Sequence, residues 1–279
     1  MGSDLSPDPT GSPLPAVDAW GAPFAAAAVA LDGRTVDRHG DTGRVVRVAS
    51  ITKLVTAWTV LLAVEEGATD LTAPLGPPGS TVRHLLCHAG GYDFDTDRVL
   101  AAPGTRRIYS NTGYELLARH IGEVTGIPFD EYLAGGVLEP LGMTSSELRG
   151  SPAADLWSDI EDLLRLAAEL RAPRVLHPTT AAAAHTCQFP ALAGVLPGWG
   201  RQDPCDWGLG PELRGTKSPH WTGSTAATGT YGHFGGSGTF LWIDPDPGPS
   251  CVVLTDREFG DWSVAAWPPF SDSVRAYFS

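Results

Sequence analysis

Segments with the pattern of β-strands lie near both ends of this chain, and segments with the pattern of helices lie between them. Short runs of apolar and β-branched residues bounded by turn-forming residues indicate strands. These runs are Phe24–Leu31, Thr35–Arg38 and Arg44–Val48 near the N-terminus, and Gly238–Ile243 and Cys251–Asp256 near the C-terminus. The order predicts an α+β fold, in which an antiparallel sheet built from both ends of the chain is flanked by helices.

Helical periodicity fills the middle of the chain. Ser50–Glu66 has apolar residues at helical spacing, and Gly67 ends it. Ser158–Leu170 begins with Ser158 and Glu161, the pattern of a capping box. Further helices are predicted at Thr81–His88, Thr112–Thr125 and about Pro269–Phe278, and residues 194–224 are predicted to be a loop.

These patterns predict one folded domain behind a tail. Residues 1–18 are rich in Pro, Ser, Asp and Gly, which predicts a disordered or extended segment. Residues 19–279 form the domain, and its sheet lobe comes from about 19–49 and 225–279. A helical lobe of about 50–224 is inserted between the two parts of the sheet lobe.

The charge balance excludes some classes of partner. The net charge is −13 and the pI is about 4.9, which argues against nucleic acid and anionic membranes as partners. The first twenty residues hold no Lys or Arg, so we expect a cytoplasmic protein without a signal peptide. The four cysteines are widely spaced and are expected to be reduced thiols.

No metal or other cofactor is expected. His84 and His88 have the spacing of a zinc-binding helix, but Leu85 stands where the glutamate of that motif belongs. The oligomeric state cannot be predicted from these patterns.

Lysine is scarce in this chain, which has two lysines, Lys53 and Lys217, and seventeen arginines. A surface lysine tolerates replacement by arginine, whereas a lysine that must lose its proton does not. Lys53 follows Ser50 by three residues at a predicted helix start, which places both side chains on one helix face. A serine with a lysine base beside it is a route to acyl transfer.

Two later segments carry groups that suit the same chemistry. Tyr109-Ser110-Asn111 precedes a predicted helix and offers a phenol for proton transfer and an amide for orienting a lysine or a carbonyl. Tyr231–Gly238 contains His233, Gly235 and Gly236 and opens an apolar strand, where glycines let a ligand approach the backbone. Trp199, Trp207 and Trp221 are equally compatible with an acyl pocket and with the core.

Taken in order, these motifs resemble the serine β-lactamase and penicillin-binding-protein superfamily. The branch that the chain resembles contains the class C β-lactamases, the D-alanyl-D-alanine carboxypeptidases, the D-aminopeptidases and the family VIII esterases. The resemblance extends to other segments and covers roughly residues 24–256, namely Val48–Lys53, Leu85-Leu86-Cys87-His88-Ala89-Gly90-Gly91, Pro103-Gly104, Tyr109–Tyr114 and Pro140-Leu141-Gly142-Met143. It implies the β-lactamase/transpeptidase-like fold.

The resemblance also implies roles for single residues. Ser50 would be the nucleophile, and Lys53 and Tyr109 would share the acid and base work. Asn111 would orient Lys53 and the substrate. His233 and Gly235 would line the site, and the N–H groups of Ser50 and Gly236 would bind the oxyanion. His233 stands where β-lactamases usually have lysine, which predicts weak recognition of a substrate carboxylate.

The sequence therefore predicts a serine hydrolase that acts on small-molecule esters, amides or thioesters through a Ser50 acyl-enzyme. One alternative is an acyltransferase or amide-forming enzyme of secondary metabolism that uses the same intermediate. A D-aminopeptidase or DD-carboxypeptidase is another, and a non-catalytic ligand-binding homologue is the alternative from a different functional class.

Overall fold

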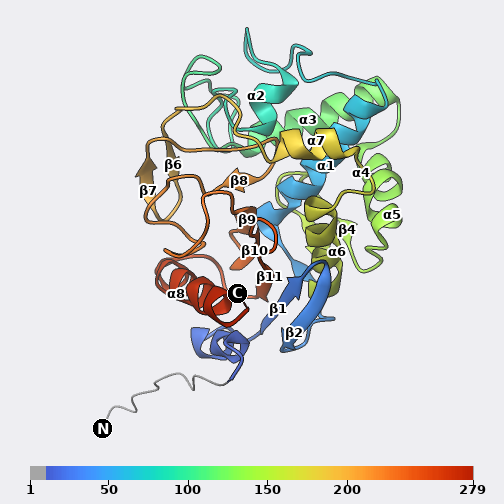
Figure 1. Cartoon of the computed structure of the whole chain (residues 1–279). Coiled ribbons are helices and arrows are strands. Elements are labelled where there is room, and N and C mark those ends of the chain that lie inside the picture. The colour runs from blue at the N-terminus through green and yellow to red at the C-terminus, as the bar shows by residue number, and fades with distance from the viewer. Residues whose placement is uncertain (1–10, 279) are drawn as a thin grey trace.

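The main sheet joins the two ends of the chain, as the strand patterns predict (Figure 1). The computed structural model describes residues 11–278. Six antiparallel strands stand in the order β2-β1-β11-β10-β9-β8. Their bounds are β1 Ala25–Leu31, β2 Arg34–His39, β8 Glu212–Leu213, β9 Tyr231–Gly235, β10 Thr239–Ile243 and β11 Ser250–Thr255. The α+β fold class is thereby confirmed.

Alternating side chains cover both faces of this sheet. In β10, Phe240 and Trp242 join one core cluster, and Leu241 and Ile243 join the other. This alternation follows from the two-residue repeat of a strand, and both faces are apolar because helices cover both. Helix α8 (Asp261–Phe278) and the 3₁₀ helix η1 (Leu14–Trp20) belong to one cluster, and α6 (Ile160–Arg171) packs on the opposite face.

The inserted helical part lies beyond α6 (Figure 1). Helix α1 (Thr52–Glu65) runs through it and packs on α3, α4 and β9. The other elements there are η2 Ala49–Ile51, α2 Val82–Leu86, α3 Asn111–Thr125, α4 Phe129–Leu133, the π-helical turn η3 Ala134–Leu138, α5 Glu139–Leu141 and α7 Pro178–Ala184. Nearly all of α1 is buried, because helices and sheet surround it.

Two small sheets accompany the main one. The first has the order β3-β5-β4, with β3 Val46–Arg47, β4 Glu147–Leu148 and β5 Leu156–Ser158. The second pairs β6 Gly194–Leu196 with β7 Gly200–Gln202. The segment 194–224, expected to be a loop, thus contains β6, β7 and β8. These strands have two or three residues each, too few for an alternating pattern to stand out.

Part of the predicted N-terminal tail is a helix. Residues 1–10 lie outside the described residues, but Leu14–Trp20 forms η1 instead of an extended segment. Leu14, Val17 and Trp20 recur every three residues, so one face of a 3₁₀ helix buries all three.

Two helix starts also differ from the sequence prediction. Asp159, and not Ser158, caps α6: its carboxylate accepts the N–H of Asp162 at 2.8 Å, while Ser158 belongs to β5. The capping-box prediction was therefore wrong. Helix α8 begins at Asp261 and contains Pro268 and Pro269, because Ser263, Trp267, Phe270 and Val274 form one continuous buried stripe along it.

Candidate active site

A short strained turn carries Ser50. The chain leaves β3 through Ala49, whose φ of +47° is unfavourable for a residue with a side chain. Ser50 then lies in η2, and α1 begins at Thr52. The Thr52 hydroxyl donates to the Ala49 carbonyl at 2.6 Å and so holds the turn. The predicted helix start at Ser50 is thus a 3₁₀ turn that leads directly into α1.

Lys53 is buried beside Ser50. Its Nζ lies 3.2 Å from Ser50 Oγ, 2.6 Å from Asn111 Oδ1 and 2.8 Å from the Ala153 carbonyl. Burial lowers the pKa of Lys53 to about 7, although the negative charges of Asp95 and Glu115 oppose the change. A lysine with this pKa is substantially neutral near pH 7, so its lone pair can accept a proton.

Tyr109 and Asn111 reach the same place from the start of α3. Asn111 accepts from Lys53 and donates through Nδ2 to Asp95 Oδ1 at 2.6 Å. The ring of Tyr109 has its centroid 4.7 Å from Lys53 Nζ. Burial raises the pKa of the Tyr109 phenol, and a hydrogen bond with Ser50 only partly opposes this rise. Tyr109 therefore keeps its proton at neutral pH and can donate it.

His233, Gly235 and Gly236 come from β9 and the turn that follows it. The sequence placed them at the opening of the strand Gly238–Ile243, but Tyr231–Gly235 is a strand of its own that pairs with β10. A Cβ on Gly235 would collide with the Val48 carbonyl and Thr239 Oγ1, so this glycine lets β9 lie against the Ser50 turn. A Cβ on Gly236 would meet nothing within 4 Å.

Ser50, Tyr109, His233 and Gly236 border one pocket of about 140 Å³, here called the Ser50 pocket. Its other walls are mostly apolar: Phe94, Arg107, Val195, Leu196, Pro197, Trp207, Phe234 and Phe259. Among these walls, only Phe234, within the Tyr231–Gly238 segment, and Trp207 were marked by the sequence. Trp199 and Trp221, the other two candidates, pack in the core beside α8.

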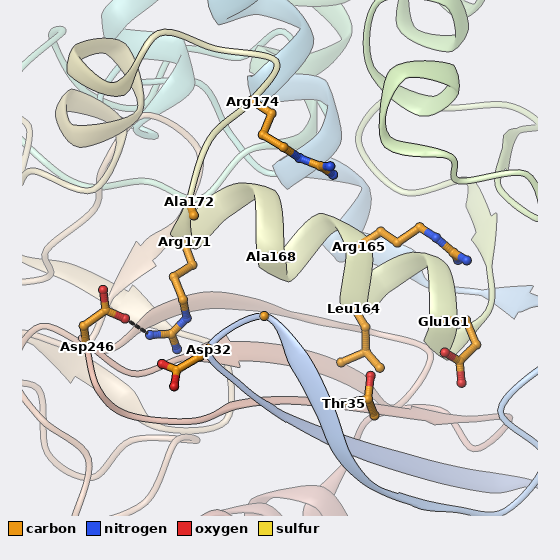
Figure 2. A pocket seen from close by; sticks show the side chains of 11 residues that line it. Asp32, Thr35, Glu161, Leu164, Arg165, Ala168, Arg171, Ala172, Arg174 and Asp246 are labelled. Atoms are coloured by element: carbon orange, nitrogen blue, oxygen red, sulfur yellow. Dashed lines mark hydrogen bonds and ion pairs between the residues drawn. The ribbon is translucent and has the colours of Figure 1, made fainter.

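A larger hollow lies away from Ser50, between α6 and the β1–β2 turn (Figure 2). It measures about 620 Å³, and an ion pair between Arg171 and Asp246 stands at one end. It is lined mainly by charged and small residues, and neither Ser50 nor Lys53 reaches it. Volume alone would favour this hollow, but the chemistry favours the Ser50 pocket.

Three further observations concern metal ions, cysteines and membrane-spanning helices. Within residues 11–278, no group of three or more His, Cys, Asp and Glu side chains is arranged to hold a metal ion. All four cysteines are free, and Cys87, Cys205 and Cys251 are buried. No helix in the described part of the chain is both long and apolar enough to cross a bilayer.

Comparisons with known proteins show the family of this chain. The Beta-lactamase family model matches residues 16–275. The chain belongs to the β-lactamase family. A β-lactamase from Mycobacterium bovis is 48% identical, with a TM-score of 0.93 over 95% of this chain and 99% of that one. The predicted superfamily and fold are thus confirmed.

The names of more distant relatives describe differing activities. EstCE1, a hydrolase with promiscuous acyltransferase activity, has a TM-score of 0.77 at 17% identity, covering 94% of this chain and 96% of that one. The D-alanyl-D-alanine-carboxypeptidase/endopeptidase AmpH of Escherichia coli K12 is 26% identical over 145 residues. That match covers 39% of this family member and only 38% of AmpH.

Proposed function

We propose that this β-lactamase family member is a serine hydrolase that cleaves small-molecule esters or amides through an acyl-enzyme on Ser50. The observation that carries the proposal is the position of Lys53. Its Nζ is buried 3.2 Å from Ser50 Oγ, with a pKa lowered to about 7. Members of this family are typically serine hydrolases, which fits a lysine placed to deprotonate a serine.

Each group then has one role in acylation. Neutral Lys53 takes the Ser50 proton as Oγ attacks the substrate carbonyl, and the N–H groups of Ser50 and Gly236 bind the oxyanion. Tyr109 gives its proton to the leaving oxygen or nitrogen as the carbonyl–leaving-group bond breaks. Lys53 returns a proton to Tyr109, so the base is neutral again. Asn111 holds Lys53 in line throughout.

Water completes the hydrolytic cycle. Its attack on the acyl carbonyl releases the acid and restores the Ser50 hydroxyl. An alcohol or amine in place of water would make the protein an acyltransferase. The apolar wall that includes Trp207 favours this second candidate, because it limits the space for water next to the acyl group.

Intact-protein mass spectrometry after mixing with p-nitrophenyl butyrate or a cephalosporin tests the proposal. Wild type is expected to gain a single butyryl group, and Ser50→Ala is expected to gain none. Lys53→Arg should also fail to acylate, because a guanidinium does not lose its proton. A butyryl adduct that persists on Ser50→Ala would contradict the proposed nucleophile.

Absence of any adduct or turnover on a folded sample would instead favour a ligand-binding homologue. Release of a terminal D-alanine from a peptide, without turnover of the ester, would favour a DD-carboxypeptidase, the activity in the name of the E. coli relative.

A further inference from the structure

Three polar atoms surround Nζ of Lys53, and two of them only accept hydrogen bonds. Asn111 Oδ1 lies 2.6 Å from Nζ and the Ala153 carbonyl oxygen lies 2.8 Å from it, while Ser50 Oγ lies at 3.2 Å. A neutral lysine amine has two hydrogens and one lone pair. The two carbonyl oxygens can each accept one hydrogen, which leaves the lone pair for the hydroxyl proton of Ser50.

This arrangement depends on which end of the Asn111 amide faces Lys53. A side-chain amide has an acceptor oxygen and a donor nitrogen at nearly equivalent positions, and a half-turn of the group exchanges them. In the reversed orientation, Nδ2 of Asn111 would face Lys53 and donate to its lone pair. The Ser50 proton would then meet a lone pair that is already engaged, so acylation needs the amide to be held one way round.

Asp95 supplies the group that distinguishes the two ends of this amide. Its Oδ1 accepts a hydrogen bond from Asn111 Nδ2 at 2.6 Å. An ionised carboxylate has only acceptor oxygens, so a reversed Asn111 would place its own oxygen against Asp95 without a shared proton. Hydrogen bonds to a charged group are also the stronger kind. The carboxylate therefore favours the orientation in which Asn111 Oδ1 faces Lys53.

Other bonds hold the backbone around Asp95 in place. The N–H of Asn111 donates to the Phe94 carbonyl at 2.7 Å, and the Ser110 hydroxyl donates to the Asp93 carbonyl at 2.7 Å. These bonds join the loop to the start of α3 without the Asp95 carboxylate. Because Asp95 itself is exposed, its replacement opens no cavity in the core and leaves these bonds intact.

We propose that Asp95 is a positioning residue for acylation, whose carboxylate fixes the Asn111 amide so that the lone pair of Lys53 is directed at Ser50. Asp95 does not line the Ser50 pocket, so it acts through Asn111 rather than on the substrate. This inference rests on the proposed acylation of Ser50.

The test compares the rates at which p-nitrophenyl butyrate acylates wild type, Asp95→Ala, Asp95→Asn and Asp97→Ala, together with Asn111→Ala and the double variant Asp95→Ala/Asn111→Ala. Burst-phase kinetics are recorded at about pH 9. Lys53 is then neutral in wild type and in the Asp95 variants. The negative charge of Asp95 raises the pKa of Lys53, so removal of this charge only lowers that pKa further below the working pH.

Asp95→Ala is expected to acylate about tenfold more slowly than wild type, because the amide loses the partner that fixes it. Asp95→Asn should recover most of the rate, since its side-chain oxygen can accept from Asn111 Nδ2. Asp97→Ala is the matched control and should stay within about twofold of wild type. Asp97 lies in the same exposed loop, and within residues 11–278 it makes no hydrogen bond with Asn111.

The double variant tests whether Asp95 acts through Asn111. In the Asn111→Ala background, the Asp95→Ala change is expected to have no further effect on the rate. A second loss of about tenfold there would overturn the positioning role.

Two other results would overturn the positioning role and leave the Ser50 mechanism intact. One is an acylation rate of Asp95→Ala equal to that of Asp97→Ala, and the other is a rate of Asp95→Asn as low as that of Asp95→Ala. Absence of acylation in wild type itself would overturn the proposed function, and this inference with it.

Discussion

At the scale of single residues, both lysines of this chain are buried, but their neighbours differ. Lys53 faces a serine, an asparagine and a carbonyl. Lys217 pairs with Glu212 at 3.0 Å and donates to the Asp206 carbonyl at 2.8 Å. The two lysines of this chain thus both occupy buried positions. Their neighbouring groups differ, and these groups suit Lys53 to accept a proton and make Lys217 a member of an ion pair.

The pKa of Lys53 predicts how acylation depends on pH. The base must be neutral, so the acylation rate should rise about tenfold per pH unit below pH 7 and level off above it. Burst-phase kinetics with p-nitrophenyl butyrate from about pH 5 to about pH 9 would measure this dependence. A rate that falls with rising pH across this range would contradict a lysine base.

The ion pair between Lys217 and Glu212 predicts an effect on stability. Burial alone would raise the pKa of Glu212, but the charges of Lys217 and His220 and the hydrogen bonds with His220 and Trp221 together outweigh burial and lower this pKa. Glu212→Gln leaves Lys217 buried without its carboxylate and should destabilise the fold by about 3–5 kcal/mol. Adding Lys217→Met should recover much of this loss.

Urea unfolding of the two single variants and the double variant measures the coupling between Glu212 and Lys217. A double variant that is less stable than both single variants would contradict the view that the unpaired charge is the main penalty.

At the scale of elements, the β9–β10 hairpin and the Ser50 turn form one contact. The Thr239 hydroxyl donates to the Val48 carbonyl at 2.9 Å, and the Ser237 hydroxyl donates to the Arg47 carbonyl at 2.8 Å. These two bonds fix the hairpin against the turn that carries Ser50. Gly235 allows the close approach, because its position has no room for a Cβ.

Gly235→Ala is therefore expected to destabilise the fold by about 1–3 kcal/mol and to lower the acylation rate. Gly236→Ala is the matched control for stability, because a Cβ there meets nothing within 4 Å. Its unfolding free energy should stay within about 0.5 kcal/mol of wild type. Thermal unfolding compares the two, and equal melting temperatures for both variants would contradict the crowding argument.

The sequence predicted the elements with long, regular patterns and missed several of the short ones. Helices α1, α3 and α6 and strands β10 and β11 lie near their predicted positions. The strands β4 to β8 were not predicted, because two or three residues cannot display a repeat. The start of α8 was missed because a buried stripe outweighs the two prolines that usually end or kink a helix.

At the scale of the whole molecule, the first and last helices of the described residues, η1 and α8, pack together over one face of the sheet. Trp20 of η1 meets Phe270 of α8 edge to face, with ring centroids 5.1 Å apart, and lies 5.8 Å from Trp262. This contact joins residues far apart in the sequence and lies outside the lining of the Ser50 pocket.

Trp20→Ala should therefore lower the unfolding free energy by about 3–5 kcal/mol without changing kcat per folded molecule. Val36→Ala serves as the control, since Val36 is 46% exposed and its loss should cost little. Chemical denaturation and active-site titration measure the two quantities. A large fall in kcat of folded Trp20→Ala would show that this face is coupled to the Ser50 pocket.

The sequence by itself determined the local relations. It set the spacing that puts Lys53 three positions after Ser50, the strand patterns near both ends, and the order of the motifs that placed Tyr109, Asn111 and His233 in one expected site. These depend on spacing and on local backbone preference, which a chain carries before it folds.

Only the tertiary structure decided the chemical state of these groups. Burial brings the pKa of Lys53 to about 7, and the Phe234 carbonyl selects the tautomer of His233. The apolar walls, such as Phe94 and Phe259, come from distant loops without a motif. Desolvation and long-range contacts arise from the packing of the whole chain, so no local pattern of residues encodes them.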